Sequence, residues 1–524
     1  MKWDGWGDPA QATELSDAQL AMVNDLLKVS AEDVDAVPRE QVRLRPSQLS
    51  AADRDALAAI VGAEAVSTDD ADRLPRAGGK STIDLLRRKS RAVQDAPDAV
   101  VIPATDEEVA AILAVCGERG IAVVPFGGGT SVVGGLEPIR GRFRAVLSID
   151  LRRFDTLESL NEIDNEAVLG AGLTGPEAER LLAAHGFELG HYPQSFRFAT
   201  IGGFAATRSS GQNSSGFGRF DEMVRGLRVV TPVGVVDVGG RAPKTAAGPD
   251  LRELFLGSEG TFGVITAVRV RVHAVPEAKE YEAWTFPDFA TGAAALRDVA
   301  QLGTGPTVLR LSDEVETALN LALGGDGAAP SGCLAVTVFE GTPELVAARH
   351  MATRELLISH GAVSLGDTPA RHWEDHRFDG PYLRDPLLAN GALVETLETA
   401  TNWSQLAELK QEVTETIQAK FGEYDSASLV LCHISHVYDT GASLYFTVVG
   451  AQRGDAIAEW MAIKAAVSDV LARHGATITH HHGVGTDHRP WLADEIGPVG
   501  VEVLRAVKAI LDPAGILNPG KLVP

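Results

Sequence analysis

Pro125-Phe126-Gly127-Gly128-Gly129-Thr130-Ser131-Val132-Val133-Gly134-Gly135 is the stretch that decides the fold. It directly follows Ile121-Ala122-Val123-Val124, an apolar run that predicts a buried strand. Glycines after a strand let backbone N–H groups approach an anion closely, and Thr130 and Ser131 add hydroxyl donors. The spacing matches neither the G-x-G-x-x-G fingerprint nor a P-loop. We therefore predict a loop that holds a phosphate through backbone dipoles.

The residues around this loop predict a mixed helix and strand unit. Residues 99–103 have the pattern of a strand, and residues 105–116 that of a helix with Thr105 as its cap. Strand, helix and strand in this order form an α/β unit. Similar patterns predict strands at residues 144–150, 166–172, 267–272 and 334–339, helices at 16–30, 50–62 and from 175, and a β-hairpin at 224–238. Residues 67–91 are charged, and we expect them to be a linker.

Length and charge restrict the class of protein. The chain has 524 residues, 45% of them hydrophobic, which suits a globular protein of two or three domains. The formal net charge of −24 disfavours a nucleic-acid partner, because binding to phosphate backbones requires a basic surface. Cys116, Cys333 and Cys432 have no paired spacing, so we predict neither a disulfide framework nor a zinc site. With no signal core and no apolar run near ~20 residues, we predict a cytoplasmic protein.

Two later stretches complete the pattern. The second is Tyr192-Pro193-Gln194-Ser195-Phe196-Arg197-Phe198-Ala199-Thr200-Ile201-Gly202-Gly203, which continues to Thr207-Arg208-Ser209-Ser210-Gly211. The third is Gly257-Ser258-Glu259-Gly260-Thr261-Phe262-Gly263. In this order the three loops resemble the flavin domain of the vanillyl-alcohol oxidase and p-cresol methylhydroxylase (PCMH) superfamily. The resemblance implies that the first loop holds the FAD pyrophosphate and that the other two wrap the rest of the cofactor.

The same resemblance implies an α+β fold. Its parts are a two-subdomain PCMH-type FAD-binding domain, an α/β cap domain that holds substrate, and a helical N-terminal region. We place the N-terminal region at residues 1–93, the FAD-binding domain at 94–274, the cap at 275–505, and a C-terminal segment that returns to the FAD domain at 506–524. The first loop contains no His or Cys, so we predict that FAD is bound non-covalently.

Two stretches carry side chains suited to proton transfer. His480-His481-His482-Gly483-Val484-Gly485 gathers three imidazoles, which titrate near neutral pH. On a strand only His480 and His482 would share a face, so we predict no metal site from the triplet alone. Tyr438 stands beside Asp439 and Gly441, and a phenol relays protons where a cation lowers its pKa. A packed ring with a bonded hydroxyl is nevertheless the commoner role of a single tyrosine.

Two arginines are candidates for holding an anion. Arg384, in Tyr382-Leu383-Arg384-Asp385, and Arg310, in Leu309-Arg310-Leu311-Ser312-Asp313, can bind phosphate or carboxylate bidentately. A surface ion pair with the nearby aspartate is the commoner arrangement for a lone arginine.

Five motifs together look like the alkyldihydroxyacetonephosphate synthase family. They are Trp3-Asp4-Gly5-Trp6-Gly7, Thr207-Arg208-Ser209-Ser210-Gly211, Tyr382-Leu383-Arg384-Asp385, Tyr438-Asp439-Thr440-Gly441-Ala442 and the triplet His480, His481 and His482. The resemblance implies that FAD acts without net redox change while a fatty alcohol replaces the fatty acid of acyl-dihydroxyacetone phosphate. It also implies that Tyr438 exchanges the proton at C1 with help from the triplet. Arg384 would bind the phosphate, and Arg310 would shape the site.

An alternative function follows from the tail. Asn518-Pro519-Gly520-Lys521 resembles the ending of D-lactate and glycolate dehydrogenases, so an FAD-dependent dehydrogenase or oxidase of a 2-hydroxy acid is the second hypothesis. Under the first hypothesis the partners are a phosphorylated lipid-like substrate and a fatty alcohol. The fatty alcohol would bring the protein peripherally to a membrane surface, and we also consider a homodimer.

Overall fold

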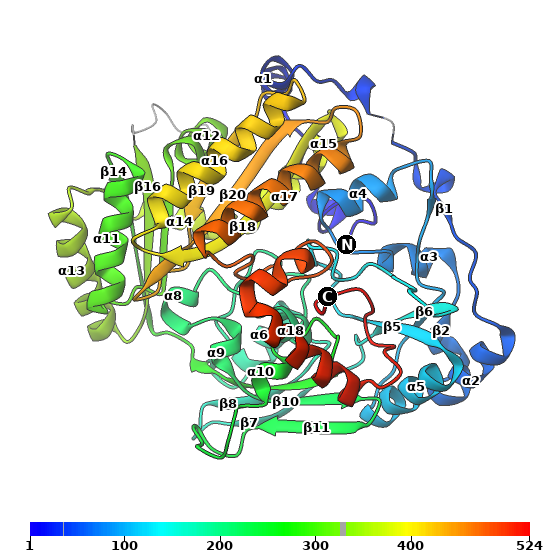
Figure 1. Cartoon of the computed structure of the whole chain (residues 1–524). Helices are drawn as coiled ribbons and strands as arrows, with labels where there is room; N and C mark the ends of the chain where they lie inside the picture. The colour runs from blue at the N-terminus through cyan, green and yellow to red at the C-terminus, as the bar shows by residue number, and fades with distance from the viewer. Residues whose placement is uncertain (35, 325–331) are drawn as a thin grey trace.

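The computed structural model describes residues 1–34, 36–324 and 332–524. Three main sheets organise these residues. Two smaller sheets carry the predicted flavin loops, and a larger sheet with its helices covers them (Figure 1). The N-terminal segment lies beside helix α4 (Thr82–Arg88), because the Lys80 ammonium next to this helix donates to the Lys2 carbonyl oxygen.

The first sheet contains the glycine loop. Strand β4 (Ala99–Val101), helix α5 (Asp106–Arg119) and strand β5 (Ile121–Phe126) form the predicted α/β unit, and Thr105 caps the helix by accepting the Glu108 N–H at 3.2 Å. Both strands pair in parallel with β6 (Ala145–Asp150), which lies between them. Strand β2 (Val66–Ser67) extends the sheet in antiparallel pairing with β4. The glycine loop therefore leaves the carboxyl end of a buried parallel strand.

The second sheet is antiparallel and has five strands. Its order is β11 (Gly234–Gly239), β10 (Val224–Thr231), β12 (Val264–Arg271), β8 (Glu166–Gly170) and β7 (Leu157–Asn161). The hairpin predicted for residues 224–238 is confirmed, because β10 and β11 pair from Gly226 with Gly239 to Thr231 with Gly234. Its short helices are α6 (Gly175–Ala183), α7 (Ile201–Thr207), α8 (Ser214–Phe217), α9 (Phe220–Met223) and α10 (Arg252–Phe255).

The cap is built on a seven-stranded sheet in which every pair of neighbours is antiparallel. Its order is β17 (Val363–Gly366), β14 (Ala278–Phe286), β16 (Cys333–Gly341), β15 (Val308–Ser312), β19 (Leu429–Ile434), β20 (Gly441–Ala451) and β18 (Ala392–Asn402). One face packs in a large apolar core against α11 (Phe289–Leu302), α13 (Pro343–Ser359), α16 (Leu406–Glu423) and α17 (Ala456–His474). The other cap helices are α12 (Glu314–Gly324), α14 (Thr368–His376) and α15 (Gly380–Ala389).

The cap sheet presents polar side chains on the face away from this core. Tyr445 of β20 pairs with His433 of β19 on one side and with Glu398 of β18 on the other. Residues paired directly across strands share a face, so these three side chains form a row. The row contacts the histidine stretch described below, because Glu398 accepts the His480 backbone N–H and Tyr445 stacks on His481.

The N-terminal region corrects one prediction. Helices α1 (Asp17–Leu27) and α2 (Ala51–Val61) are confirmed, and a capping box of Ser16 and Gln19 starts the first. Residues 67–91, expected to be a charged linker, instead form α3 (Asp70–Arg73) and α4 and bury several of their charged side chains. The remaining short strands pair as β1 (Arg43–Leu44) with β3 (Val93–Gln94) and β9 (Phe187–Glu188) with β13 (His273–Ala274).

The C-terminal segment ties the flavin loops together. Helix α18 (Leu492–Leu511) ends at the tail, where Leu517 forms a parallel bridge with Val123 of β5. The side-chain amide of Asn518 donates to the carbonyl oxygens of Gly135 at 3.1 Å and Glu259 at 2.6 Å. No helix among the described residues combines the length and apolar character needed to span a bilayer.

Candidate active site

The structure brings the three predicted loops into contact. A Cβ atom on Gly127 would lie 2.3 Å from Thr200 Oγ1, and one on Gly128 would lie 2.0 Å from the Phe198 carbonyl oxygen, so only glycine allows this approach. The third loop joins the second through backbone bonds from Gly257 to Ala205 and from Glu259 to Ala206, both 3.0 Å. The predicted cofactor-binding residues thus form one continuous wall, although they come from three parts of the chain.

This wall has the chemistry that a dinucleotide requires. The hydroxyl groups of Ser210, Ser258 and Thr261 are buried and have no hydrogen-bond partner among the described residues. A buried hydroxyl without a partner is costly, so its presence on a glycine-lined surface indicates a polar ligand. Gly129 and Gly260 have φ values of +71° and +73°, which expose successive backbone N–H groups. The residues present therefore fit FAD.

Two predicted cofactor residues use their side chains inside the protein. The Glu259 carboxylate accepts the backbone N–H groups of Val484 and Gly485, and complete burial raises its pKa to about 7. Arg208 forms an ion pair with Glu253 at 2.5 Å and has a left-handed φ of 51°. Only their backbone atoms and, for Arg208, part of the cavity surface remain for a ligand, and their roles in cofactor binding stay predictions.

Tyr438 and the histidine triplet meet at the centre of the site. The Tyr438 hydroxyl lies 2.6 Å from His480 Nε2, and His480 Nδ1 lies 3.1 Å from His481 Nδ1. Because a neutral imidazole carries one N–H, the phenol can donate to Nε2 while His480 donates from Nδ1 to His481. This arrangement is a proton path of three side chains that starts at the phenol.

Burial determines the protonation of this path. Burial lowers the pKa of His480 well below its usual range and that of His481 to about 3, so both rings are neutral near pH 7. Burial raises the pKa of Tyr438 to about 12, and the guanidinium of Arg219 beside the phenol opposes that rise. The cation that faces Tyr438 is therefore Arg219, which sequence reasoning missed because no motif marks it.

Glu398 is a second residue that the sequence did not reveal. Its fully buried carboxylate accepts the backbone N–H groups of His480, His481 and His482 at 2.7, 3.2 and 3.0 Å, and the Thr479 hydroxyl at 2.6 Å. The triplet forms a bend around this carboxylate and not a strand. For this reason the neighbours His480 and His481 meet, which the alternation of side chains along a strand did not predict.

Glu398, His480 and His481 also have ligand atoms within 4.8 Å of one another. These atoms already exchange hydrogen bonds, since the carboxylate holds the backbone of the bend and His480 bonds Tyr438 and His481. Their geometry is explained by this network, which we call the histidine group and define as Tyr438, His480, His481 and Glu398.

A cavity of about 660 Å³ opens beside the histidine group. Tyr438, His480, His481 and Arg219 line its polar side, together with Thr207, Arg208 and Gly257 of the flavin loops. Apolar atoms come from Ala400, Ala442, Val484 and Ile496, the last on α18. The cavity thus has room for an organic substrate between the proton path and an apolar wall.

The two predicted arginines have different surroundings. Arg310 pairs with Glu316 at 2.5 Å and not with Asp313, and Glu316 also bonds His433, whose ring stacks on Tyr445. Arg384 does not pair with Asp385, and it donates to the Lys80 carbonyl oxygen at 2.6 Å. Its Nε and one terminal nitrogen have no partner among the described residues. Arg310 is therefore satisfied within the chain, whereas Arg384 keeps donors for a ligand.

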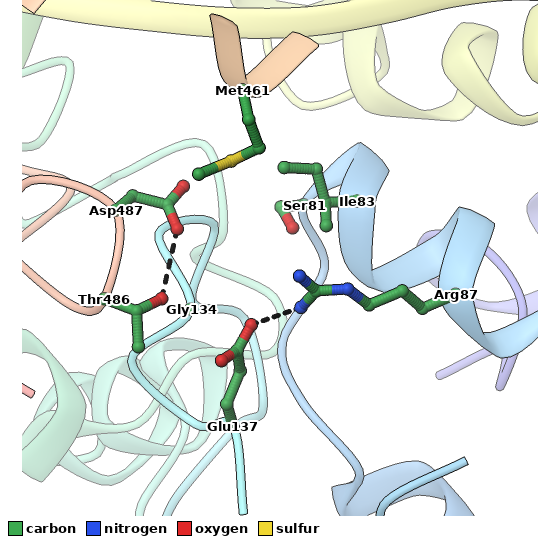
Figure 2. A pocket seen from close by; sticks show the side chains of 8 residues that line it. All are labelled: Ser81, Ile83, Arg87, Gly134, Glu137, Met461, Thr486 and Asp487. Atoms are coloured by element: carbon green, nitrogen blue, oxygen red, sulfur yellow. Dashed lines mark hydrogen bonds and ion pairs between the residues drawn. The ribbon is translucent and has the colours of Figure 1, made fainter. Parts of the chain in front are cut away.

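A smaller cavity of about 190 Å³ lies beside Gly134 of the glycine loop (Figure 2). Gly134 and Glu137 come from the loop side, and Ser81, Ile83 and Arg87 come from α4 and the residue before it. The Arg87 guanidinium points into this cavity and pairs with Glu137 (Figure 2). One terminal nitrogen of Arg87 is therefore paired with a carboxylate, whereas two nitrogens of Arg384 have no partner among the described residues.

Comparison with known proteins agrees with this geometry. Residues 97–239 match the family model described as FAD binding domain, and residues 275–522 match that described as FAD linked oxidases, C-terminal domain. An alkyldihydroxyacetonephosphate synthase of Trypanosoma brucei brucei is 31% identical over all of this chain and 92% of its own length. That of Dictyostelium discoideum is 30% identical over all of this chain and 93% of its length.

The chain belongs to the alkyldihydroxyacetonephosphate synthase family. A solved structure of such a synthase superposes with a TM-score of 0.84 at 29% identity, covering 99% of this chain and 98% of the other. FAD is the cofactor of this family member, since the matched FAD-binding model contains the glycine loop and the second loop. The α+β fold with a PCMH-type flavin domain is confirmed by the same comparisons.

Proposed function

We propose that this protein replaces the acyl chain of acyl-dihydroxyacetone phosphate with a fatty alcohol, as the family name implies. The observation that supports this most directly is the 2.6 Å contact between Tyr438 and His480 at the edge of a cavity that also has an apolar wall. The exchange needs a group that removes and returns the C1 proton while the acid leaves and the alcohol adds. FAD, when bound, supplies an electron-accepting ring that lets this exchange proceed without net oxidation or reduction.

Tyr438 can accept a proton without first becoming a free phenolate. With its pKa raised to about 12, phenolate is scarce at neutral pH. The phenol can instead take the C1 proton while passing its own to His480 Nε2, and His480 then passes its Nδ1 proton to His481. The Arg219 cation stabilises negative charge on the phenol oxygen during this transfer.

The substrate is held by groups on either side of this path. Arg384 has unpartnered guanidinium atoms for the phosphate, and the apolar cavity wall suits an alkyl chain. Arg310 acts indirectly in this proposal, because its ion pair with Glu316 fixes His433 and, through that ring, Tyr445. Tyr445 in turn stacks on His481 with ring centres 5.9 Å apart.

The decisive test is an anaerobic assay of the purified holoenzyme with acyl-dihydroxyacetone phosphate and a long-chain alcohol. We expect alkyl product and free fatty acid in equal amounts with no added electron acceptor. Turnover of 2-hydroxy acids only in the presence of an acceptor, with no exchange, would replace this proposal with the dehydrogenase alternative.

We further propose that FAD is bound non-covalently. The first loop, where the cofactor phosphates are expected, offers neither a histidine nor a thiol. Acid precipitation should then leave the flavin in the supernatant, and flavin that stays on the denatured chain would contradict this.

We also propose a peripheral contact between α18 and a membrane surface. Val499, Val503, Ala506 and Ile510 recur at helical spacing on its exposed side, and Val499 is 76% exposed. Ile496, which lies before the break in the helix at Gly497, lines the cavity, so the stripe would bring the cavity to the lipid that dissolves a fatty alcohol. Flotation with neutral liposomes should recover the wild type but not Val499→Asp/Val503→Asp. A homodimer stays a prediction for sedimentation to test.

A further inference from the structure

Three cations lie together next to the glycine loop, two of them buried and the third half-buried. Lys80 and Arg88 are 4% and 2% exposed, and they flank α4. Arg384 of α15 reaches them through its bond to the Lys80 carbonyl oxygen. We call Lys80, Arg88 and Arg384 the cation group. Its position is fixed against the first flavin loop, because the Lys80 backbone N–H donates to the Ser131 carbonyl oxygen at 2.7 Å.

The cation group has more donors than the chain satisfies. Nε and one terminal nitrogen of Arg88, and the same pair of atoms in Arg384, are buried without a hydrogen-bond partner among the described residues. Among the residues that the structure describes, Arg88 has one hydrogen-bond partner, the Trp3 carbonyl oxygen at 3.1 Å, and the Lys80 ammonium has one, the Lys2 carbonyl oxygen. Buried guanidinium groups are normally fully paired, so four vacant donor atoms indicate a missing anion.

The nearby carboxylates do not fill this role. Asp385 accepts Lys2 and the Trp6 backbone N–H, and Asp84 accepts the hydroxyl and N–H of Ser81 at the start of α4. Glu395 is bonded to the backbone N–H groups of Thr82 and Thr396. These acids moderate the positive charge of the group, but none of them bonds to the vacant guanidinium atoms.

A short N-terminal segment closes the cation group from outside. The segment Trp3-Asp4-Gly5-Trp6-Gly7 follows the Asp385 and Tyr382 side chains so closely that a Cβ on Gly5 would lie 2.0 Å from Asp385 and one on Gly7 2.2 Å from the Tyr382 hydroxyl. The Trp6 ring meets Phe198 of the second flavin loop edge to face, with centres 5.8 Å apart. The motif therefore excludes water from the cations and joins the cap to the flavin domain.

We propose that the cation group is a buried site for one phosphate group, closed by the Trp3–Gly7 segment. A phosphate has the charge and the acceptor oxygens that two unpaired guanidinium forks and an ammonium require. Two sources have this chemistry. One is the phosphate of the substrate assumed in the proposed function, and the other is the pyrophosphate of FAD in the adjoining glycine loop. The site assigns Lys80 and Arg88 to ligand binding beside Arg384 and gives the N-terminal motif a function.

The test compares Arg88→Met with Arg87→Met in the purified holoenzyme. Both substitutions lie on α4, but Arg87 is exposed and already paired with Glu137. Equilibrium binding is measured for dihydroxyacetone phosphate and for unphosphorylated dihydroxyacetone, and retention is measured for FAD and for reconstituted riboflavin. We expect Arg88→Met, and not Arg87→Met, to lose about ten-fold to a hundred-fold in one phosphate-bearing ligand only.

The two arms separate the sources. A loss confined to dihydroxyacetone phosphate, with full flavin content, assigns the site to the substrate. A loss confined to FAD, with riboflavin retained normally, assigns it to the cofactor. Affinities within two-fold of wild type for both ligands would overturn the proposal. If Arg88→Met does not fold, Lys80→Met is measured in its place by the same criteria. No turnover is needed, so failure here leaves the exchange reaction to its own assay.

Discussion

The histidine group and the cation group both contact strand β18, and they differ in how their polar atoms are satisfied. Glu398 of β18 binds three backbone N–H groups of the histidine bend, and each imidazole of the path has a partner. On the same strand Val394 and Glu395 bind Thr82, which positions α4 with Arg88. There the guanidinium donors remain vacant. The histidine group already has the hydrogen bonds along which a proton can move. The cation group needs a ligand to complete its hydrogen bonds.

The largest effect should come from a substitution in the histidine group. Tyr438→Phe keeps the packed ring and removes the hydroxyl that bonds His480. General acid–base catalysis is worth ~10²–10⁴-fold, so we expect exchange turnover to fall by about that factor with FAD content unchanged. Tyr281→Phe is the matched control, because Tyr281 of β14 has a hydroxyl that donates to Glu374 of α14. Turnover near wild type in Tyr438→Phe would remove this residue from the proton path.

Glu398→Gln should have the next largest effect, although Glu398 is a positioning residue. The amide keeps one acceptor oxygen, so the bend loses part of its anchoring and His480 shifts relative to Tyr438. Displacements of this kind cost about ten-fold to a hundred-fold in turnover. We expect kcat to fall with KM nearly unchanged, together with a lower Tm.

Glu412→Gln serves as the control for this substitution, because Glu412 bonds His474 and Arg473 at the surface of the cap. A purely structural role for Glu398 predicts a lower Tm with normal kcat in the surviving protein, and that result would contradict the positioning role.

In the cation group, Arg384→Lys should weaken binding of the phosphorylated substrate more than it slows the chemical step. Lysine keeps the positive charge but lacks the planar fork that grips a phosphate with two bonds. The loss of one charge-assisted hydrogen bond corresponds to ~1.5–3 kcal/mol, so we expect KM for the phosphorylated substrate to rise by about ten-fold or more. Steady-state kinetics would show kcat changed by less than KM, and an equal fall in kcat and kcat/KM would argue against a phosphate role.

The two groups also show how much of the fold and of the site could be predicted from the sequence. The α/β unit, the hairpin of β10 and β11 and the glycine loop were predicted correctly, because each depends on patterns within about 30 residues. The meeting of Tyr438 with His480 was implied only by the family resemblance. Neither resemblance nor spacing indicated Arg219 or Glu398, since their contacts join distant segments through the cap sheet.

The cation group shows why the sequence did not reveal the buried charges beside the glycine loop. Residues 67–91 look like a solvated linker, because charged side chains are usually exposed. Their burial depends on Arg384, which is 304 residues away from Lys80, and on the N-terminal segment that covers both. Only the folded chain reveals that these charges are buried and lack partners.

The last predicted effect is on stability and not on turnover or binding, and it is a pH dependence that belongs to Lys80. Burial, together with Arg88 and Arg384, lowers the pKa of its ammonium from 10.5 to about 7, while Asp385 and Asp4 oppose this. Below pH 7 the ammonium is charged in both the folded and the unfolded chain, so the full free-energy cost of burying this charge lowers the stability of the fold. Between pH 7 and 10.5 only the unfolded chain keeps the proton, so this group makes stability rise with pH.

Lys80→Met should remove this rise. Tm is measured from pH 7 to pH 10 for the wild type, for Lys80→Met and for Lys420→Met, whose exposed ammonium pairs with Glu423. We expect the wild type to gain stability relative to Lys80→Met over this range and Lys420→Met to follow the wild type. If Lys80 holds a phosphate, saturating dihydroxyacetone phosphate should keep its proton bound and flatten the wild-type rise. A wild-type curve parallel to that of Lys80→Met would show that the ammonium already has all the hydrogen-bond partners it needs. The cation group would then be satisfied within the protein, as the histidine group is.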